Sequence, residues 1–246
     1  MNRYSAGVRP CFALMIAASL SGCAASDSTL SGAPSLETAR VALSSGSADL
    51  ALNICTNLLA KRPRDGALLV CRADALVTLG RNAEAIGLYQ TALDLDGRLA
   101  TAKLGLGRIY LGSDPARAEA LFLDALTSEP RNAQVLNNLG IARDLQGRHS
   151  EAQMAYGEAI AAAPDLRAPQ VNLALSMAMT GRAGEAVRIM RPIGERADAT
   201  PRERHDLAAV LAMDGKADEA ARVLRTDMDG KQADEAVVGF QSLPGR

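Results

Sequence analysis

The feature that most constrains this 246-residue chain is a repeat of 34 residues that runs through most of it. One column of the repeat contains only alanine, at Ala51, Ala85, Ala118, Ala152, Ala186 and Ala220. A second column contains only alanine or glycine, at Ala39, Ala73, Gly107, Gly140, Ala174 and Ala208. Each column has one step of 33 residues, which places a single-residue deletion between Gly107 and Ala118. Such a period is typical of stacked units that each bury an apolar face against the next one.

Composition and local signals predict a pair of helices in each unit. The chain is rich in Ala and Leu, lacks Trp and has only 3% aromatic residues, which favours an all-α fold. Small side chains let two helices cross closely, which explains both columns. Glycines that can end the first helix stand at Gly46, Gly80, Gly147, Gly181 and Gly215. Larger side chains, expected to fill the space between repeats, stand at Cys55, Tyr89, Phe122, Tyr156, Met190 and Leu224.

The pattern resembles the tetratricopeptide repeat (TPR), a helix-turn-helix unit that stacks into an α-solenoid. The register predicts a TPR array over residues 32–228, with repeats at 32–65, 66–99, 100–132, 133–166, 167–200 and 201–228. Residues 229–246 contain the amphipathic stretch KQADEAVVGF, for which we expect a capping helix that covers the last apolar face. The first repeat matches least well, because Thr38, like Arg72 in the second repeat, occupies a column that later holds leucine.

Residues 1–22 have the layout of an export signal. Arg3 and Arg9 precede the apolar run CFALMIAASL, and small residues follow it. This run is shorter than the roughly 20 apolar residues that a membrane-spanning helix needs. We therefore expect residues 1–22 to be removed.

The sequence LSGC at residues 20–23 resembles the lipobox of bacterial lipoprotein precursors. The resemblance implies that Cys23 is lipidated and becomes the mature N-terminus, and several acyl chains on one residue anchor a protein stably. An ordinary signal peptide with an incidental cysteine is the alternative. Because Ala24 and not Asp follows Cys23, the resemblance implies an anchor at the periplasmic face of the outer membrane. Residues 23–31 are expected to form a lipidated flexible tether.

The mature chain would retain only Cys55 and Cys71. An oxidising periplasm permits a disulfide, but cysteines in apolar helical patterns are more often buried thiols, and we expect buried thiols here. No Cys-x-x-Cys motif and no Cys/His spacing indicates a metal site. We expect no cofactor.

The first helix of each unit is expected to line a concave face that binds peptides. One row of candidate binding residues comprises Arg40, Asp74 and Arg108, and a second comprises Asn138, Asn172 and Asp206, with Asn137 beside it. Asparagine offers both a donor and an acceptor to an extended peptide backbone. The alternative is that these residues form the solvated face of amphipathic helices.

Charge and motifs argue against nucleic-acid binding and catalysis. The formal net charge is −1, without the basic excess of a nucleic-acid-binding protein. His149 and His205 accompany no recognisable nucleophile motif, and we expect both to be solvated. Carboxylates recur at the repeat period, at Glu84, Glu151, Glu185 and Glu219, which indicates helix-surface roles. We therefore expect no enzyme and no small-molecule substrate.

Residues 133–228 resemble one group of repeat proteins more specifically. The stretches NLGIARDLQGRHSEAQMAYGEAI, VNLALSMAMTGRAGEAVRIMRPIG and ATPRERHDLAAVLAMDGKADEAARVLRTDM are similar to the TadD-type lipoproteins of the Tad (Flp) pilus assembly system. The resemblance implies a scaffold that binds protein partners, such as the pilus secretin or other Tad components, and helps them assemble at the outer membrane. An envelope TPR lipoprotein that serves outer-membrane protein insertion or peptidoglycan enzymes is the alternative.

Overall fold

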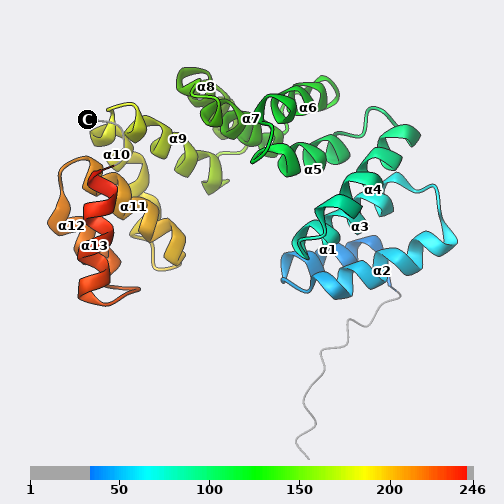
Figure 1. Ribbon diagram of the computed structural model, residues 1–246, viewed down its shortest axis with the longest axis horizontal. Helices are drawn as coiled ribbons and strands as arrows, with labels where there is room; N and C mark the ends of the chain where they lie inside the picture. Colours follow the sequence, from blue (N-terminus) through cyan, green and yellow to red (C-terminus); the bar gives the residue numbers. More distant parts are fainter. Residues whose placement is uncertain (1–33, 243–246) are drawn as a thin grey trace, which may run out of the picture. The chain divides into compact units, whose positions relative to one another are not determined.

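The computed structural model describes residues 34–242, and this part of the chain folds into thirteen α-helices without a β-strand (Figure 1). The odd-numbered helices are α1 (Leu36–Ser44), α3 (Gly66–Thr78), α5 (Ala100–Tyr110), α7 (Ala133–Leu145), α9 (Arg167–Met179), α11 (Pro201–Met213) and α13 (Gly230–Gln241). The even-numbered helices are α2 (Ala48–Lys61), α4 (Asn82–Leu95), α6 (Pro115–Ser128), α8 (His149–Ala162), α10 (Ala183–Gly194) and α12 (Ala217–Leu224). The predicted all-α solenoid is confirmed. The proposed export signal, Cys23 and the tether up to residue 31 lie outside the described residues.

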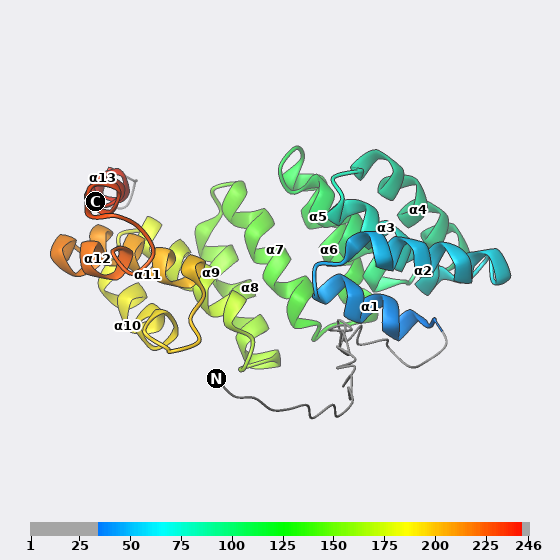
Figure 2. The same cartoon turned by 90° about the horizontal axis from the view of Figure 1, so that it is seen from below.

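Helices stack in chain order. Each helix contacts the next one, and consecutive helices lie side by side in both views (Figure 1 and Figure 2). Each odd-numbered helix also packs against the next odd-numbered helix, whereas the backbones of the even-numbered helices in the described part stay more than 8 Å apart, and α10 meets α12 through the side chains of Arg191 and Glu219. Side chains from neighbouring repeats therefore meet along the odd-numbered helices. We call the surface that the odd-numbered helices form the odd-helix face.

Five of the six helix pairs are joined by the predicted glycine turns. Gly46, Gly80, Gly147, Gly181 and Gly215 all have a positive φ, between 73° and 81°. In the fourth repeat, the Arg148 N–H donates to the Arg143 carbonyl at 2.9 Å, and the Gly147 N–H donates to the Asp144 carbonyl at 2.9 Å. This pair of bonds is the Schellman motif, which ends a helix with a left-handed residue. The prediction of glycine stops is confirmed.

The third repeat differs at the position of the single-residue deletion. Helix α5 spans 11 residues, against 13 for α3, α7, α9 and α11. The chain enters α6 through Asp114, whose carboxylate accepts the Arg117 N–H at 3.0 Å, and Pro115 follows as the first helical residue. A side-chain cap and a proline thus start the second helix without a left-handed glycine before it.

The core reproduces the repeat columns. Every residue of the alanine column is fully buried, and the column of larger side chains is buried as well. A Cβ atom at Gly107 would lie 2.4 Å from the ring of Phe122, and one at Gly140 would lie 2.3 Å from the ring of Tyr156. The small residue at these two positions therefore admits an aromatic ring of the paired helix. A bulkier residue would clash there, as the repeat columns predict.

The expectation of free thiols is also wrong, because Cys55 and Cys71 form a disulfide. Their Cα atoms lie 6.2 Å apart, and both residues are buried in the contact between α2 and α3. Two residues 16 apart come together because the chain reverses direction between these helices. The bond ties the first repeat to the second.

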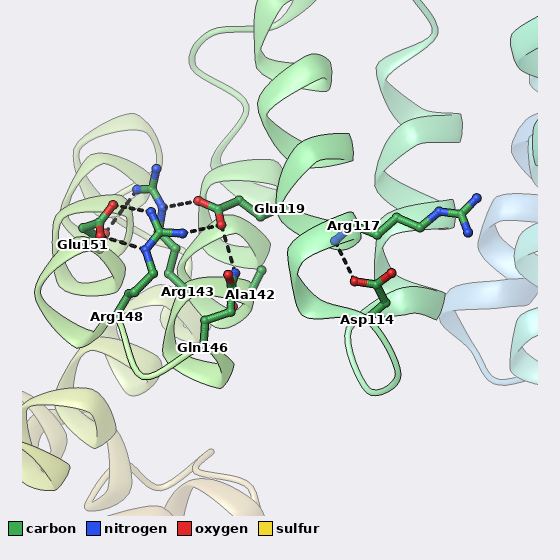
Figure 3. A network of polar contacts seen from close by, with 8 residues as sticks. All are labelled: Asp114, Arg117, Glu119, Ala142, Arg143, Gln146, Arg148 and Glu151. Carbon is green, nitrogen blue, oxygen red and sulfur yellow. Dashed lines mark hydrogen bonds and ion pairs between the residues drawn. The ribbon is translucent and has the colours of Figure 1, made fainter.

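A network of charged side chains around the buried Glu119 connects α6 to α7 and α8 (Figure 3). Glu119 is only 8% exposed, and its carboxylate accepts hydrogen bonds from Arg143 at 3.0 Å, Gln146 at 2.9 Å and Arg148 at 2.5 Å. Arg148 also binds Glu151. Burial alone would raise the pKa of Glu119, but the hydrogen bonds from Gln146, Arg143 and Arg148 outweigh it and lower the pKa. The network fixes the position of α7.

Helix α13 closes the array as the predicted capping helix. It packs against α11 and α12 through the buried residues Ala233 and Val237. Its other side exposes the charged residues Lys231, Asp234 and Glu235. Among the residues that the model describes, no helix has both the length and the apolar character required to cross a membrane.

Candidate peptide-binding groove

A groove of about 390 Å³ opens on the odd-helix face between α7, α9 and α11. We call it the α7–α11 groove. It is lined by Asn137, Ile141, Ala168, Val171, Asn172, Leu175, Thr200, Arg202, Glu203 and Asp206. The structure therefore brings three of the predicted binding residues, Asn137, Asn172 and Asp206, to one cavity. Its volume falls within the range of ligand pockets.

Two asparagines form the polar centre of the groove. The Asn172 Nδ2 donates to the Asn137 Oδ1 at 2.8 Å, which orients both amides. Asn137 is 8% exposed, and its Nδ2 has no hydrogen-bond partner between residues 34 and 242; the Asn172 Oδ1 has none either. The pair therefore offers the amide NH2 of Asn137 as a donor group and the Oδ1 of Asn172 as an acceptor, as a peptide C=O and N–H require.

Asp206 contributes a carboxylate from α11. The side chain is half-buried and makes no ion pair or hydrogen bond within the described part of the chain. Burial raises its pKa, and the positive charges of Arg202 and His205 oppose this shift. Glu203 differs, because its carboxylate lies 3.2 Å from Arg167 and also accepts the Thr200 N–H at 2.8 Å in a capping box. Asp206 is thus the carboxylate of the groove that has no partner.

The row of Arg40, Asp74 and Arg108 lies on α1, α3 and α5, away from the α7–α11 groove. Both arginines are exposed, and no ion pair within 4.0 Å joins either of them to Asp74 in the described residues. Burial raises the pKa of Asp74, whereas a hydrogen bond from the Tyr89 hydroxyl and the charges of Arg108 and Arg40 act in the opposite direction. The three side chains therefore form one electrostatic row.

Comparison with known proteins agrees with this architecture. A family model described as tetratricopeptide repeat matches residues 36–100, 72–113 and 103–167, which together span more than half of the chain. The chain belongs to the tetratricopeptide repeat family. A search of curated proteins found no match.

Several solved TPR structures share the fold. One is PilW, described as a widely conserved type IV pilus biogenesis factor, with 19% identity over 82% of this chain and 96% of PilW, and a TM-score of 0.72. Another is a thermophilic TPR protein of Thermus thermophilus, with 22% identity over 72% of this chain and 97% of that one, and a TM-score of 0.65. A third is YrrB, described as having an unusual peptide-binding site, with 18% identity over 77% and 98% of the two chains and a TM-score of 0.56. At these identities the similarity shows the fold alone.

Within this TPR protein, Asn138 lies beside the groove and does not line it. Its Nδ2 donates to the Gln134 carbonyl of the same helix at 2.7 Å. The contact across repeats joins Asn137 to Asn172, 35 residues apart, although the repeat column joins Asn138 to Asn172. Each helix meets the preceding and the following repeat through different faces, so residues of one repeat column need not contact each other.

Sequence reasoning missed the apolar part of the groove, which Ile141, Val171 and Leu175 form. The repeat column that contains Arg40, Asp74 and Arg108 could have indicated two of these residues. Continued by 33 and then 34 residues, the column leads to Ile141 and Leu175. The same TPR position is therefore charged in the first repeats and apolar in the later ones.

The expectation of solvated histidines is wrong. His149 is half-buried, with its Nδ1 2.9 Å from an Asp144 carboxylate oxygen, and Asp144 also accepts hydrogen bonds from Tyr156 and Ser176. His205 is half-buried too, and its Nε2 has no hydrogen-bond partner within residues 34–242. Ser176 donates to Asp144 and not to His149, so this cluster lacks the contact that activates a serine nucleophile.

The periodic glutamates occupy helix surfaces, as expected from their spacing. Glu84, Glu151 and Glu185 each pair with the arginine three residues before them. Glu219 pairs instead with Arg191 of the preceding repeat, at 2.7 Å.

Proposed function

We propose that this TPR protein is a non-enzymatic scaffold that holds an extended segment of a protein partner in the α7–α11 groove. The observation that carries the proposal is the Asn137–Asn172 pair, which presents an amide NH2 group and a carbonyl oxygen inside a cavity of about 390 Å³. Ile141 and Leu175 add apolar contact area beside it. An extended backbone bonded at its polar groups, with side chains in adjacent apolar positions, is a common mode of peptide recognition.

The process that the scaffold serves is the assembly of a Tad (Flp) pilus, with the secretin or another pilus component as partner. Two observations support this part of the proposal. Residues 133–228 resemble TadD-type lipoproteins, and the α7–α11 groove lies within that segment. The fold is also that of PilW, described as a type IV pilus biogenesis factor. A tethered scaffold would promote assembly by raising the local concentration of its partner.

The protein acts at the periplasmic face of the outer membrane, anchored through lipid on Cys23. The lipobox-like sequence LSGC supports this placement. The Cys55–Cys71 disulfide adds independent support, because structural disulfides persist in oxidising compartments such as the periplasm. Replacing Cys23→Ser should move the protein from the membrane fraction to the soluble periplasmic fraction, and retention in the membrane fraction would contradict the anchor.

The proposed function is tested by purifying the full-length protein from its own cells in mild detergent and identifying bound proteins by mass. The wild type is compared with Asn172→Ala, and with Gln90→Ala, which removes an exposed amide on α4. We expect pilus components to dominate, and their yield to fall for Asn172→Ala but not for Gln90→Ala, while both variants melt near the wild-type temperature. Enrichment of peptidoglycan enzymes or outer-membrane insertion factors would contradict the pilus role. Equal yields from all three proteins would contradict the role of the groove.

A further inference from the structure

The apolar side of the α7–α11 groove continues onto exposed surface. Leu145 follows Ile141 by one helical turn on α7, and Met179 follows Leu175 by one turn on α9, so each pair lies on one face of its helix. Leu145 is 56% exposed and Met179 is 42% exposed, and α7 contacts α9. Ile141, Leu145, Leu175 and Met179 therefore form what we call the apolar strip. Contiguous exposed apolar side chains beside a cavity mark an interaction site.

Helix α11 contributes two carboxylates, Glu203 and Asp206, to the groove. Asp206 is half-buried and forms no ion pair with any of residues 34–242, whereas Glu203 is already paired with Arg167. Arg202 is the basic residue of the lining, but it is exposed and forms no ion pair with Asp206 within 4.0 Å in the described part of the chain. A basic group from a partner would complement Asp206, and such complementarity at an interface governs specificity.

The asparagine pair belongs to the same lining. Asn137 precedes Ile141 by one turn on α7, and Asn172 precedes Leu175 by about one turn on α9, the helix that packs against α11. Packed helices are about 10 Å apart, and an extended chain advances about 3.3 Å per residue. A side chain that reaches Asp206 would therefore lie about three residues from one that contacts the strip on α9.

We propose that the α7–α11 groove selects an extended partner segment that carries two aliphatic side chains and, about three residues away, a lysine or arginine. The aliphatic side chains cover the apolar strip, the backbone bonds to Asn137 and Asn172, and the basic side chain pairs with Asp206. The inference rests on the proposed function, because it specifies the partner chemistry of the same groove.

The first test is selection of random peptides displayed on phage against the immobilised full-length protein in detergent. Three proteins are compared: the wild type, Asp206→Lys, and Asp94→Lys as a matched charge reversal on the exposed surface of α4. We expect peptides with paired aliphatic residues and a nearby basic residue from the wild type and from Asp94→Lys. Asp206→Lys should instead select an acidic residue at that place. Selection without a charge preference, or the same preference from Asp206→Lys, would overturn the proposal.

The second test measures the affinity of one selected peptide and guards against misfolding of a charge-reversed variant. Asp206→Asn keeps the shape of the side chain and removes its charge, and we expect it to bind about tenfold more weakly than the wild type. The same peptide with its basic residue replaced by norleucine should bind wild type and Asp206→Asn equally. A loss of affinity that persists with the norleucine peptide would contradict the Asp206 pairing. Because these tests use the purified protein, a partner from another envelope machine would refute the pilus role without affecting the peptide specificity.

Discussion

The Cys55–Cys71 disulfide should matter most for the stability of the first repeat. The bond closes a loop between residues 16 apart, for which the loss of chain entropy in the unfolded state corresponds to about 3 kcal/mol. Helix α1 is the weaker half of this repeat, because it spans 9 residues and buries only Ala39 and Ala42, whereas α2 spans 14 residues and buries five. In a stacked array each repeat contacts only its neighbours, so the loss on reduction should stay local.

Hydrogen–deuterium exchange with mass detection, with and without reductant, measures this directly. Because 1.4 kcal/mol corresponds to a factor of ten, losing about 3 kcal/mol should lower the protection of amides in α1 and α2 by about a hundredfold. Amides of α9 and α11 should exchange at an unchanged rate. Reduction leaves both sulfurs in the protein, so the comparison isolates the cross-link from the packing of the side chains.

A double variant, Cys55→Ala with Cys71→Ala, provides the control. Its exchange should be fast in α1 and α2 already, and reductant should have no further effect. Unchanged protection of α1 and α2 in the reduced wild type would refute the reasoning. A loss spread evenly from α1 to α11 would refute it too, because it would mean that the array unfolds as one unit.

Two further predictions concern the core and the charge network. Gly140→Ala should lower the free energy of unfolding by about 1–3 kcal/mol, because its Cβ would lie 2.3 Å from the Tyr156 ring. Gly157→Ala, at a position with open space around it, should not destabilise the protein. Chemical denaturation of both variants measures this. Glu119→Gln should lower the free energy of unfolding by about 2 kcal/mol at pH 7, because it removes a buried negative charge that pairs with two arginines. Replacing the exposed Glu84 by Gln should lower the free energy of unfolding much less. Folding lowers the pKa of Glu119, so the stabilisation by its carboxylate is present above the pKa of an unfolded glutamate and is lost as the pH falls through the lower folded value. The difference in free energy of unfolding between wild type and Glu119→Gln should therefore shrink below about pH 4.5. A difference that stays constant with pH would contradict the network.

Periodicity made the architecture predictable. The alanine column and the turn glycines recur because every repeat solves the same local problem, and five of the six turns use a left-handed glycine where the sequence placed one. The third repeat, with its deletion, uses Asp114 and Pro115 instead. A period therefore reveals what all units share, and departures from it show where one unit differs.

The contacts between repeats were harder to predict. Asn172 meets Asn137 and not Asn138, because α7 and α9 contact each other through different faces. The pairing of Cys55 with Cys71 depends on which faces of α2 and α3 meet, and the apolar patterns of the two helices do not specify that. Such details depend on the relative placement of helices, for which a single sequence carries little information.

The most direct test of the central claim is photo-crosslinking in living cells from position 175. A photoreactive amino acid in place of Leu175 sits in the α7–α11 groove, and one in place of Leu123 on α6 provides an exposed apolar control outside the groove. The account predicts that position 175 forms one dominant adduct, with a pilus component such as the secretin, and that position 123 does not. The absence of that adduct, equal adducts from both positions, or an adduct with a peptidoglycan enzyme or an outer-membrane insertion factor would contradict it.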